Sequence, residues 1–326
     1  MHYTSAPYLT QPTNTGHLML QVLLALIPGT FVMTWIFGYG ILINIMLAII
    51  SALAIEACVL AIRKKPVLNT LKDNSAIVSA VLLALSIPPL APWWIIVIGI
   101  LFAMVVAKHL YGGLGFNIFN PAMTGYAVLM ISFPLQMTLW PDLNRPLLSF
   151  NDSFSWQFFH QLPATVSLDA ITSATPLDAL NTAKRVNFSN IGAKDMTLIN
   201  NYCWWILSST WLIGGCWLTY TRILAWQLPI SFLCSFTMLT GIYWLINPAV
   251  HASPLFSLLH GSVIMAAFFI LTDPVTAPQM PKGKVISGIL VAILVFVIRN
   301  WAGYPDGVAF AVLLMNLAVP VIDRYT

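Results

Sequence analysis

The chain has very little charge. Of its 326 residues only 7% are Asp, Glu, Lys or Arg, whereas 59% are hydrophobic and the mean hydropathy is +0.85. A soluble domain usually carries about a quarter charged residues, because its surface must face water. The scarcity of charge therefore excludes an ordinary soluble domain and predicts a surface that faces a lipid bilayer.

Cysteine is also scarce. Cys58, Cys203, Cys216 and Cys234 all lie in hydrophobic segments, with no C-x-x-C spacing and no histidine at ligand spacing. Isolated thiols of this kind are typical of reduced side chains packed between helices. We therefore expect no metal or iron–sulfur site in this chain.

Long apolar runs, in contrast, recur along the chain, and each is near the length of about 20 residues that a helix needs to cross a bilayer. We place them at 18–37, 41–62, 75–90, 93–109, 121–137, 202–220, 226–246, 254–272, 285–299 and 307–322. The predicted fold is an all-α integral membrane protein with about ten transmembrane helices. Residues 1–137 and 202–326 would form two halves of about five helices each, and residues 138–201 one long loop between them.

The basic residues predict the orientation in the membrane. No Lys or Arg precedes Arg63, so the basic start of a cleavable signal peptide is missing. If the N-terminus is cytoplasmic, the only basic residue in the short outside segments is Arg299. The loop 138–201 is so long that the positive-inside rule does not count its basic residues. The short inside segments then hold Arg63, Lys64, Lys65, Lys72, Lys108, Arg222, Lys282, Lys284 and Arg324. We expect both termini in the cytoplasm and the loop in the periplasm, and we attribute the net charge of +4 to topology and not to nucleic-acid binding.

The two halves share a sequence repeat. Residues 85–92 (LSIPPLAP) return as residues 271–278 (LTDPVTAP), and Gly112-Gly113 is echoed by Ala302-Gly303. The two copies are five helices apart, and an odd offset reverses the orientation of the second copy. This pattern predicts an inverted-topology repeat, with chance similarity between apolar segments as the alternative.

Helix-breaking residues predict a site within the bundle. Pro and Gly interrupt helices at membrane depth and free backbone groups to face a cavity. Glycine permits close backbone approach, and asparagine can hydrogen-bond a polar ring. A tight turn is the alternative for each break. The residues expected to line a cofactor or quinone-like cavity are Gly112, Gly113, Asn117, Asn120, Thr272 and Asp273.

Glu56 is the only glutamate, and it lies inside an apolar segment. A carboxylate at that depth is costly unless it is protonated, paired or facing water. We expect Glu56 to couple redox chemistry to ion or proton movement, with a structural polar contact as the alternative.

The long loop contains the sequence DAITSATPL at residues 169–177. It resembles the flavin-attachment motif of the Rnf and sodium-pumping quinone reductase complexes, whose Ser-Gly-Ala-Thr carries FMN on its last threonine. The resemblance implies a phosphoester between FMN and Thr175, formed when a flavin transferase lets the hydroxyl displace AMP from FAD. Pro176 favours an extended backbone at Thr175, which exposes that hydroxyl. The other motif residues are Asp169, Ser173 (where the motif usually has Gly), Ala174, Pro176 and Leu177.

Three further segments extend this resemblance over nearly the whole chain. They are residues 108–123 (KHLYGGLGFNIFNPAM), 272–278 (TDPVTAP) and 303–316 (GYPDGVAFAVLLMN). Together they resemble the NqrB/RnfD family, and its Rnf members more closely, because NqrB subunits are usually longer at the N-terminus.

This resemblance implies a membrane flavoprotein component of an ion-translocating electron transport complex in the bacterial inner membrane, without a complete activity alone. Such a complex relays electrons between ferredoxin and NAD-linked partners and moves Na⁺ or H⁺. The implied partners are the other subunits of the Rnf complex (A, B, C, E and G), a flavin transferase and the lipid bilayer. The implied cofactors are covalent FMN and, as a further expectation, a second flavin such as riboflavin.

Two other functions remain open at this stage. An inverted repeat with broken helices is also typical of secondary transporters. The chain could equally be a passive structural anchor for redox partners. Covalent flavin on the chain would distinguish the electron-transfer flavoprotein from the transporter. Turnover that survives removal of Thr175 would indicate the passive anchor.

Overall fold

A computed structural model of the chain describes residues 15–143, 145–164, 166–185, 202–248, 251–302, 304 and 306–326. Apart from one isolated bridge between Pro141 and Thr172, the regular structure of these residues is entirely helical. The predicted all-α fold is confirmed.

The first half of the chain packs its helices around the short, mostly apolar helix α4. Residue Asn120 starts α6, because its side chain accepts a hydrogen bond from the Met123 backbone N–H and Pro121 occupies the first helical position. The helices are α1 (Thr15–Phe37), α2 (Gly40–Ile62), α3 (Val67–Leu71), α4 (Ser75–Ser86), α5 (Trp93–Leu101), its π-helical continuation η1 (Phe102–His109) and α6 (Pro121–Ser132).

The loop that follows carries short helices, and residues 186–201 of the predicted loop lie outside the described residues. It contains η2 (Gln136–Thr138), α7 (Phe150–Phe159), α8 (Leu168–Ile171) and α9 (Pro176–Arg185). The second half contains α11 (Tyr202–Tyr220), α12 (Gln227–Ile246), α13 (Pro254–Leu259), α14 (Val263–Met265), the π-helix η3 (Ala266–Ile270), α15 (Pro281–Trp301) and α16 (Val308–Tyr325).

Most predicted spans coincide with these helices, and three differ. The span expected at 121–137 ends at Ser132, because Pro134 disfavours helical geometry at the residue before it. The span expected at 254–272 is broken between α13 and α14, where Gly261 has a φ of +87°. The span expected at 285–299 is part of the longer helix α15, which has 21 residues.

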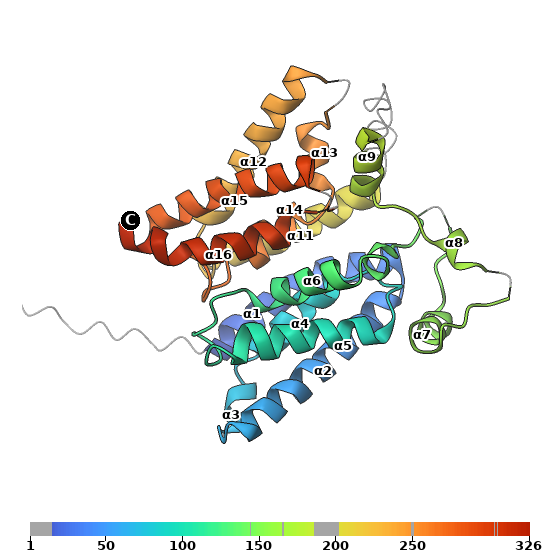
Figure 1. The fold of residues 1–326 in the computed structure, drawn as a ribbon, viewed down its shortest axis with the longest axis horizontal. Helices are drawn as coiled ribbons and strands as arrows, with labels where there is room; N and C mark the ends of the chain where they lie inside the picture. The colour runs from blue at the N-terminus through green and yellow to red at the C-terminus, as the bar shows by residue number, and fades with distance from the viewer. Residues whose placement is uncertain are drawn as a thin grey trace, which may run out of the picture.

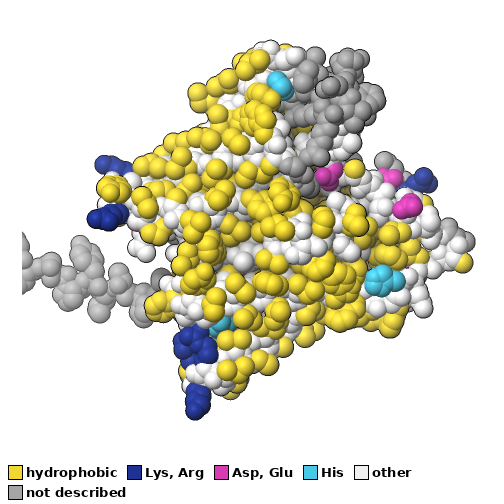
Figure 2. All heavy atoms as spheres, in the orientation of Figure 1, with side chains coloured by type: hydrophobic (Ala, Val, Ile, Leu, Met, Phe, Trp, Pro, Cys, Tyr) yellow, Lys and Arg dark blue, Asp and Glu magenta, His cyan; other side chains and the backbone are white. Residues whose placement is uncertain are grey.

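The helices present an apolar surface outward. Five described helices are long and apolar enough to cross a membrane, namely α1, α2, α12, α15 and α16, and shorter apolar helices lie at 75–86, 93–109 and 121–132. Side chains such as Phe31, Ile50 and Leu245 are exposed by 74%, 65% and 71%. Hydrophobic atoms cover most of the face drawn in Figure 2, which is what a multi-pass membrane protein requires.

The two halves lie side by side and repeat the same helix contacts. Helix α2 packs against α4 and α5, as α12 packs against η3 and α15. Helix pairs α1–α11 and α6–α16 join the halves, and α7, α8 and α9 lie at the end opposite to the C-terminus (Figure 1). Along the α1–α11 contact the backbones approach closely at glycines, since a Cβ on Gly214 would lie 2.3 Å from the Ala25 carbonyl oxygen.

The two repeat copies lie at opposite ends of the bundle. Residues 85–92 lie beside the loop, because the Leu90 carbonyl accepts a hydrogen bond from the Trp156 indole of α7. Residues 271–278 lie at the other end, where Asp273 is next to Asn120. This placement is what an inverted repeat requires. In Figure 2, most of the Lys and Arg atoms gather at the end of the C-terminus and α3, and the carboxylates gather at the loop end.

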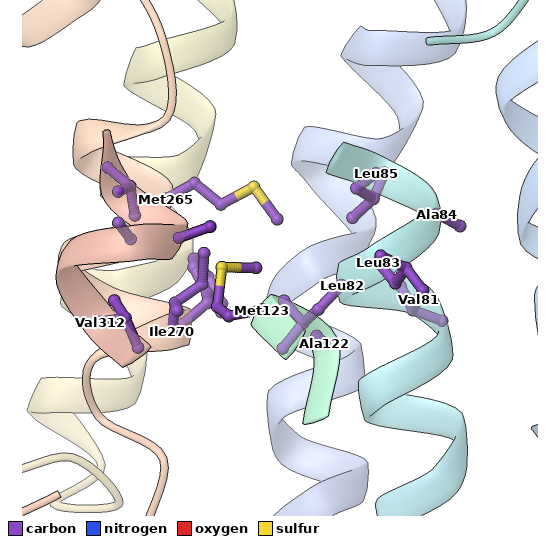
Figure 3. Packing of buried hydrophobic residues seen from close by; sticks show 14 of the residues in the cluster. Val81, Leu82, Leu83, Ala84, Leu85, Ala122, Met123, Met265, Ile270 and Val312 are labelled. Atoms are coloured by element: carbon purple, nitrogen blue, oxygen red, sulfur yellow. The ribbon is translucent and has the colours of Figure 1, made fainter. Parts of the chain in front are cut away.

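Between the halves, α4 and α6 face α14, η3 and α16 (Figure 3). Met265 extends from the second half toward Leu85 of α4, and Met123 of α6 lies beside Ile270. These side chains are all buried. The seam therefore contains flexible methionines, which can adapt their shape to what lies beside them.

Candidate functional site

The loop motif is held against the bundle by backbone pairing. The Asp142 N–H donates to the Ile171 carbonyl at 2.8 Å, and the Ser173 N–H donates to the Trp140 carbonyl at 3.0 Å. Along the motif, Asp169, Ser173 and Ala174 are exposed, Thr175 is half-buried, and Pro176 and Leu177 are buried. Thr175 therefore lies where the chain passes from the surface into the molecule.

Thr175 begins helix α9. Its hydroxyl donates to Asp178 Oδ2 at 2.6 Å and accepts from the Asp178 backbone N–H at 3.3 Å. A threonine followed three residues later by an acid is a typical helix start. This arrangement fixes the position of the Thr175 oxygen.

Thr175 and Asp178 lie on the wall of a cavity of about 130 Å³ between the two halves, which we name the loop-side cavity. Its wall is largely apolar, as is usual for sites that bind organic cofactors. The aromatic and methionine residues of the wall are Met33, Phe37, Met123, Tyr126, Met130, Met137, Trp140, Trp204, Trp211 and Met265.

Asp306, on the wall of this cavity, forms an ion pair with the buried Arg299. Asp306 Oδ1 lies 3.0 Å from Arg299 Nη2, and Asp306 Oδ2 accepts from the Ser262 backbone N–H at 2.9 Å. Arg299 Nη1 also donates to the Ser257 carbonyl at 2.9 Å. Arg299 was expected in a short outside segment, but it lies buried at the end of α15 because Asp306 pairs with it.

The two carboxyls at this end titrate differently. Burial raises the pKa of Asp178, and the nearby negative charge of Asp306 raises it further, against the lowering effect of the Thr175 hydrogen bonds. Burial also acts to raise the pKa of Asp306, but Arg299 and Ser262 outweigh it and hold that pKa below its ordinary value. Asp178 is therefore the more basic carboxylate of the two.

A second cavity of about 110 Å³, which we name the far cavity, lies at the opposite end of the seam. It brings together Asn117, Asn120, Thr272 and Asp273, four of the residues expected to line a cofactor site. The Asn120 amide nitrogen lies 3.5 Å from Asp273 Oδ2. Among the described residues the buried Asn117 Oδ1 has no hydrogen-bond partner, so it is available to a ligand.

Gly112 and Gly113 are not among the residues that line the far cavity. Their φ angles are +134° and +109°, and they form the turn that follows η1. Lys65 Nζ donates to the Gly112 carbonyl at 3.2 Å. The structure therefore places these two glycines in a tight turn beside the far cavity's residues in sequence, as the alternative described.

Glu56 is fully buried, and it is not a lone carboxylate as its sequence context suggested. Lys108 Nζ lies 2.5 Å from Glu56 Oε1 and also donates to Ser75 Oγ at 2.7 Å, and His109 Nε2 lies 3.3 Å from Oε1. Lys108 was expected in a short inside segment, but only 2% of it is exposed, because Glu56 pairs with it. Lys108 and Ser75 also line the far cavity, so this cluster forms part of the cavity wall.

No site role was expected for Asp178, Lys108, Arg299 or Asp306, which the structure places at or beside the two cavities. Only Asp178 carried a local signal, the Thr-x-x-Asp spacing of a helix start. Lys108 and Glu56 are 52 positions apart, and no local pattern connects them.

Comparison with known proteins shows the family of the chain. Residues 2–326 match the model of the NQR2, RnfD, RnfE family. The chain is 44% identical over 337 residues to the D subunit of the ion-translocating oxidoreductase complex of Aliivibrio salmonicida, which covers 99% of this chain and 96% of the relative. It is 45% identical over 336 residues to the proteins of that name from Shigella dysenteriae serotype 1 and Escherichia coli O139:H28, with the same coverage. Matches of this extent show that the chain belongs to the NQR2, RnfD, RnfE family.

Proposed function

We propose that this protein is the membrane flavoprotein component of an Rnf-type electron transport complex, and that Thr175 carries covalent FMN. Its relatives bear the name of the D subunit of the ion-translocating oxidoreductase complex. The observation that carries the proposal is the position of Thr175 on the wall of the loop-side cavity. A flavin joined to this hydroxyl has its phosphate at the start of α9 and an apolar, aromatic cavity beside it for its ring.

The far cavity suits a second flavin, such as riboflavin. The edge of a flavin ring carries both hydrogen-bond donors and acceptors, and the wall offers the Asn117 and Asn120 amides and the Asp273 carboxyl. The two cavities extend from opposite ends of the seam and adjoin at α6, where the neighbouring residues Ala122 and Met123 line the far and the loop-side cavity respectively. Flavins in both would form a relay along the seam, with the protein supplying position and electrostatics.

Glu56 and Lys108 are the proposed link to ion movement. Lys108 holds a positive charge at the wall of the far cavity and is neutralised by Glu56. A negative charge that arrives on a cofactor there competes with Glu56 for Lys108. The balance of charge at Glu56 then depends on the redox state, which is the requirement for coupling to Na⁺ or H⁺.

The remaining parts of the proposal follow from the family. The protein would lie in the bacterial inner membrane with both termini in the cytoplasm and the loop 138–201 in the periplasm. It would assemble with the other subunits of the Rnf complex (A, B, C, E and G), and a flavin transferase would attach the FMN. A secondary transporter remains the alternative, because the inverted repeat and the helix breaks are also typical of transporters.

The test is in-gel fluorescence of the denatured chain. We expect Thr175→Ala to abolish covalent flavin while the protein still inserts into the membrane, because the ester oxygen is gone. Thr172→Ala is the matched control, since Thr172 lies in the same motif and, among the described residues, its hydroxyl donates to the Leu168 carbonyl at 3.0 Å. Fluorescence that survives in Thr175→Ala and disappears in Thr172→Ala would move the attachment to Thr172. A wild-type chain without covalent flavin would favour the transporter.

A further inference from the structure

The loop contains two helix starts with the same hydrogen bonds. Ser149 Oγ donates to Asp152 Oδ2 at 2.6 Å and accepts from the Asp152 N–H at 3.2 Å. Thr175 Oγ1 donates to Asp178 Oδ2 at 2.6 Å and accepts from the Asp178 N–H at 3.3 Å. Both arrangements stabilise the first turn of a helix.

Their surroundings differ. Ser149 is exposed, and its hydrogen bonds lie at the surface of the loop. Thr175 and Asp178 are half-buried on the wall of the loop-side cavity, next to the exposed residues Ser173 and Ala174. A partner enzyme can therefore reach Thr175 from the surface, while Asp178 stays behind it in a partly dry site.

We propose that Asp178 is the general base of flavin attachment, so that the acceptor chain activates its own nucleophile. This inference rests on the proposed attachment of FMN to Thr175. Thr175 Oγ1 attacks the FMN phosphorus of FAD, and the new oxygen–phosphorus bond forms as the bond from that phosphorus to AMP breaks. AMP leaves with the bonding electron pair, and the hydroxyl proton passes to Asp178 Oδ2. No electrons are exchanged, and the flavin transferase supplies FAD and its binding site.

The geometry meets the requirements of this step. A hydroxyl is a weak nucleophile unless a base lies within about 2.6–3.2 Å of it. The raised pKa of Asp178 makes it a stronger base than an ordinary aspartate. Once protonated, Asp178 is neutral, so it does not repel the phosphodiester formed next to it, and the start of α9 favours a phosphate.

The experiment measures the rate of flavin attachment to the full-length chain in membrane vesicles from cells that lack the transferase. Purified transferase and FAD are added, and covalent fluorescence is followed on denaturing gels. We expect Asp178→Asn to lower the initial rate about 100-fold at neutral pH, because Asn accepts the Thr175 hydrogen bond but is not a base. Asp152→Asn is the matched control and should react at the wild-type rate.

The pH profile separates a base from a helix cap. Asp178 must be ionised to accept a proton, so the rate ratio of wild type to Asp178→Asn should shrink as the pH falls through the pKa of Asp178. We do not expect Asp178→Asn to lower the rate of attachment by destabilising the fold. Burial makes the Asp178 charge unfavourable above its unfolded pKa, so Asn should leave the melting temperature at neutral pH unchanged or higher.

Several outcomes would overturn the inference. A wild-type rate in Asp178→Asn at every pH would leave Asp178 as a cap only, or would mean that the transferase acts before the loop folds. Equal losses in Asp178→Asn and Asp152→Asn would assign the effect to helix stability. Absence of covalent flavin from the wild type as well would reject the attachment at Thr175 itself, which distinguishes that failure from a failure of Asp178.

Discussion

At the scale of single residues, the structure shows that several charged side chains are buried and paired. The sequence indicated that Glu56 is a lone carboxylate and that Lys108 marks the cytoplasmic side of the membrane. In the structure the two form one buried ion pair, with Ser75 and His109 beside it. The π-helical turn of η1 contains both Lys108 and His109 and directs these consecutive side chains into the bundle. Such turns are frequent at functional sites.

Glu56→Gln should affect both stability and coupling. Removing one partner of a buried ion pair typically costs about 3–5 kcal/mol, because the other charge is left uncompensated. We expect a lower melting temperature and slowed turnover or lost ion pumping in the purified complex, with covalent flavin still present.

The double variant Glu56→Gln with Lys108→Met separates these two effects. The double variant leaves no unpaired charge, so its melting temperature should be closer to that of the wild type than that of Glu56→Gln. The losses of stability from the two single substitutions should therefore not add. Ion pumping should stay impaired, because the titratable carboxylate is still missing. Pumping at the wild-type rate and stoichiometry in the double variant would show that Glu56 is structural.

At the scale of elements, the sequence predicted the helices well where a local signal existed. Apolar runs located α1, α2, α11 and α12 within a few residues, because composition alone determines a span. Helix-breaking residues likewise located Asn117, Asn120, Thr272 and Asp273 at one cavity. The same reasoning does not separate a turn from a cavity wall at Gly112 and Gly113, because both need the same residue type, and these two glycines form a turn.

The break between α13 and α14 could not be predicted, because its cause is tertiary. Gly261 has a positive φ, and a Cβ there would lie 2.6 Å from Arg299 Nη2 and 2.8 Å from Leu177 Cδ1. Those two residues come from α15 and α9. The docking of the loop motif beside Trp140 depends in the same way on backbone pairing between distant residues.

Gly261→Ala should loosen the docking of α9 on the bundle. The substitution forces an L-residue into a left-handed conformation and displaces Arg299 and Leu177, so we expect a loss of at least about 1 kcal/mol. Thermal unfolding and the yield of covalent flavin should both fall. Gly241→Ala is the control. A Cβ there makes only an ordinary contact of 3.7 Å with Pro254 Cγ, and Ala favours the interior of α12. Equal stability of the two variants would argue that the break tolerates a side chain.

At the scale of the whole molecule, the two cavities lie along one seam between inverted halves. Thr175 lines the loop-side cavity. The polar residues of the two helix breaks, Asn117 with Asn120 and Thr272 with Asp273, line the far cavity. The seam is built from side chains such as Met123, Met265 and Ile270 (Figure 3). Both cavities are lined by residues of the two halves, so neither half alone forms either of them.

The sidedness of the bundle can be tested by cysteine labelling. In a chain whose native cysteines are replaced, Lys184→Cys should react with an impermeant reagent in intact spheroplasts, and Lys65→Cys should react only after lysis. Basic residues in short segments remain on the cytoplasmic side, and Lys65 lies in such a segment at the end away from the loop. The opposite labelling pattern would invert the proposed topology.

The two cavities should also lose their cofactors independently. Asn117→Ala removes a buried acceptor from the far cavity, and one lost hydrogen bond should weaken a bound flavin about tenfold. Non-covalent flavin released from the denatured, purified complex should fall, while covalent flavin on Thr175 stays at the wild-type level. Thr175→Ala should give the reverse pattern.

Asn44→Ala is the matched control for the far cavity. Asn44 is also a buried amide, but it bonds to the Pro88 carbonyl and to Gln157 at the loop end of the bundle. Its replacement costs stability without touching the far cavity, so the content of non-covalent flavin should not change. Equal flavin content in Asn117→Ala and Asn44→Ala would place any second flavin outside the far cavity. Joint loss of both flavins in Asn117→Ala would mean that the cavities fill as one cooperative unit.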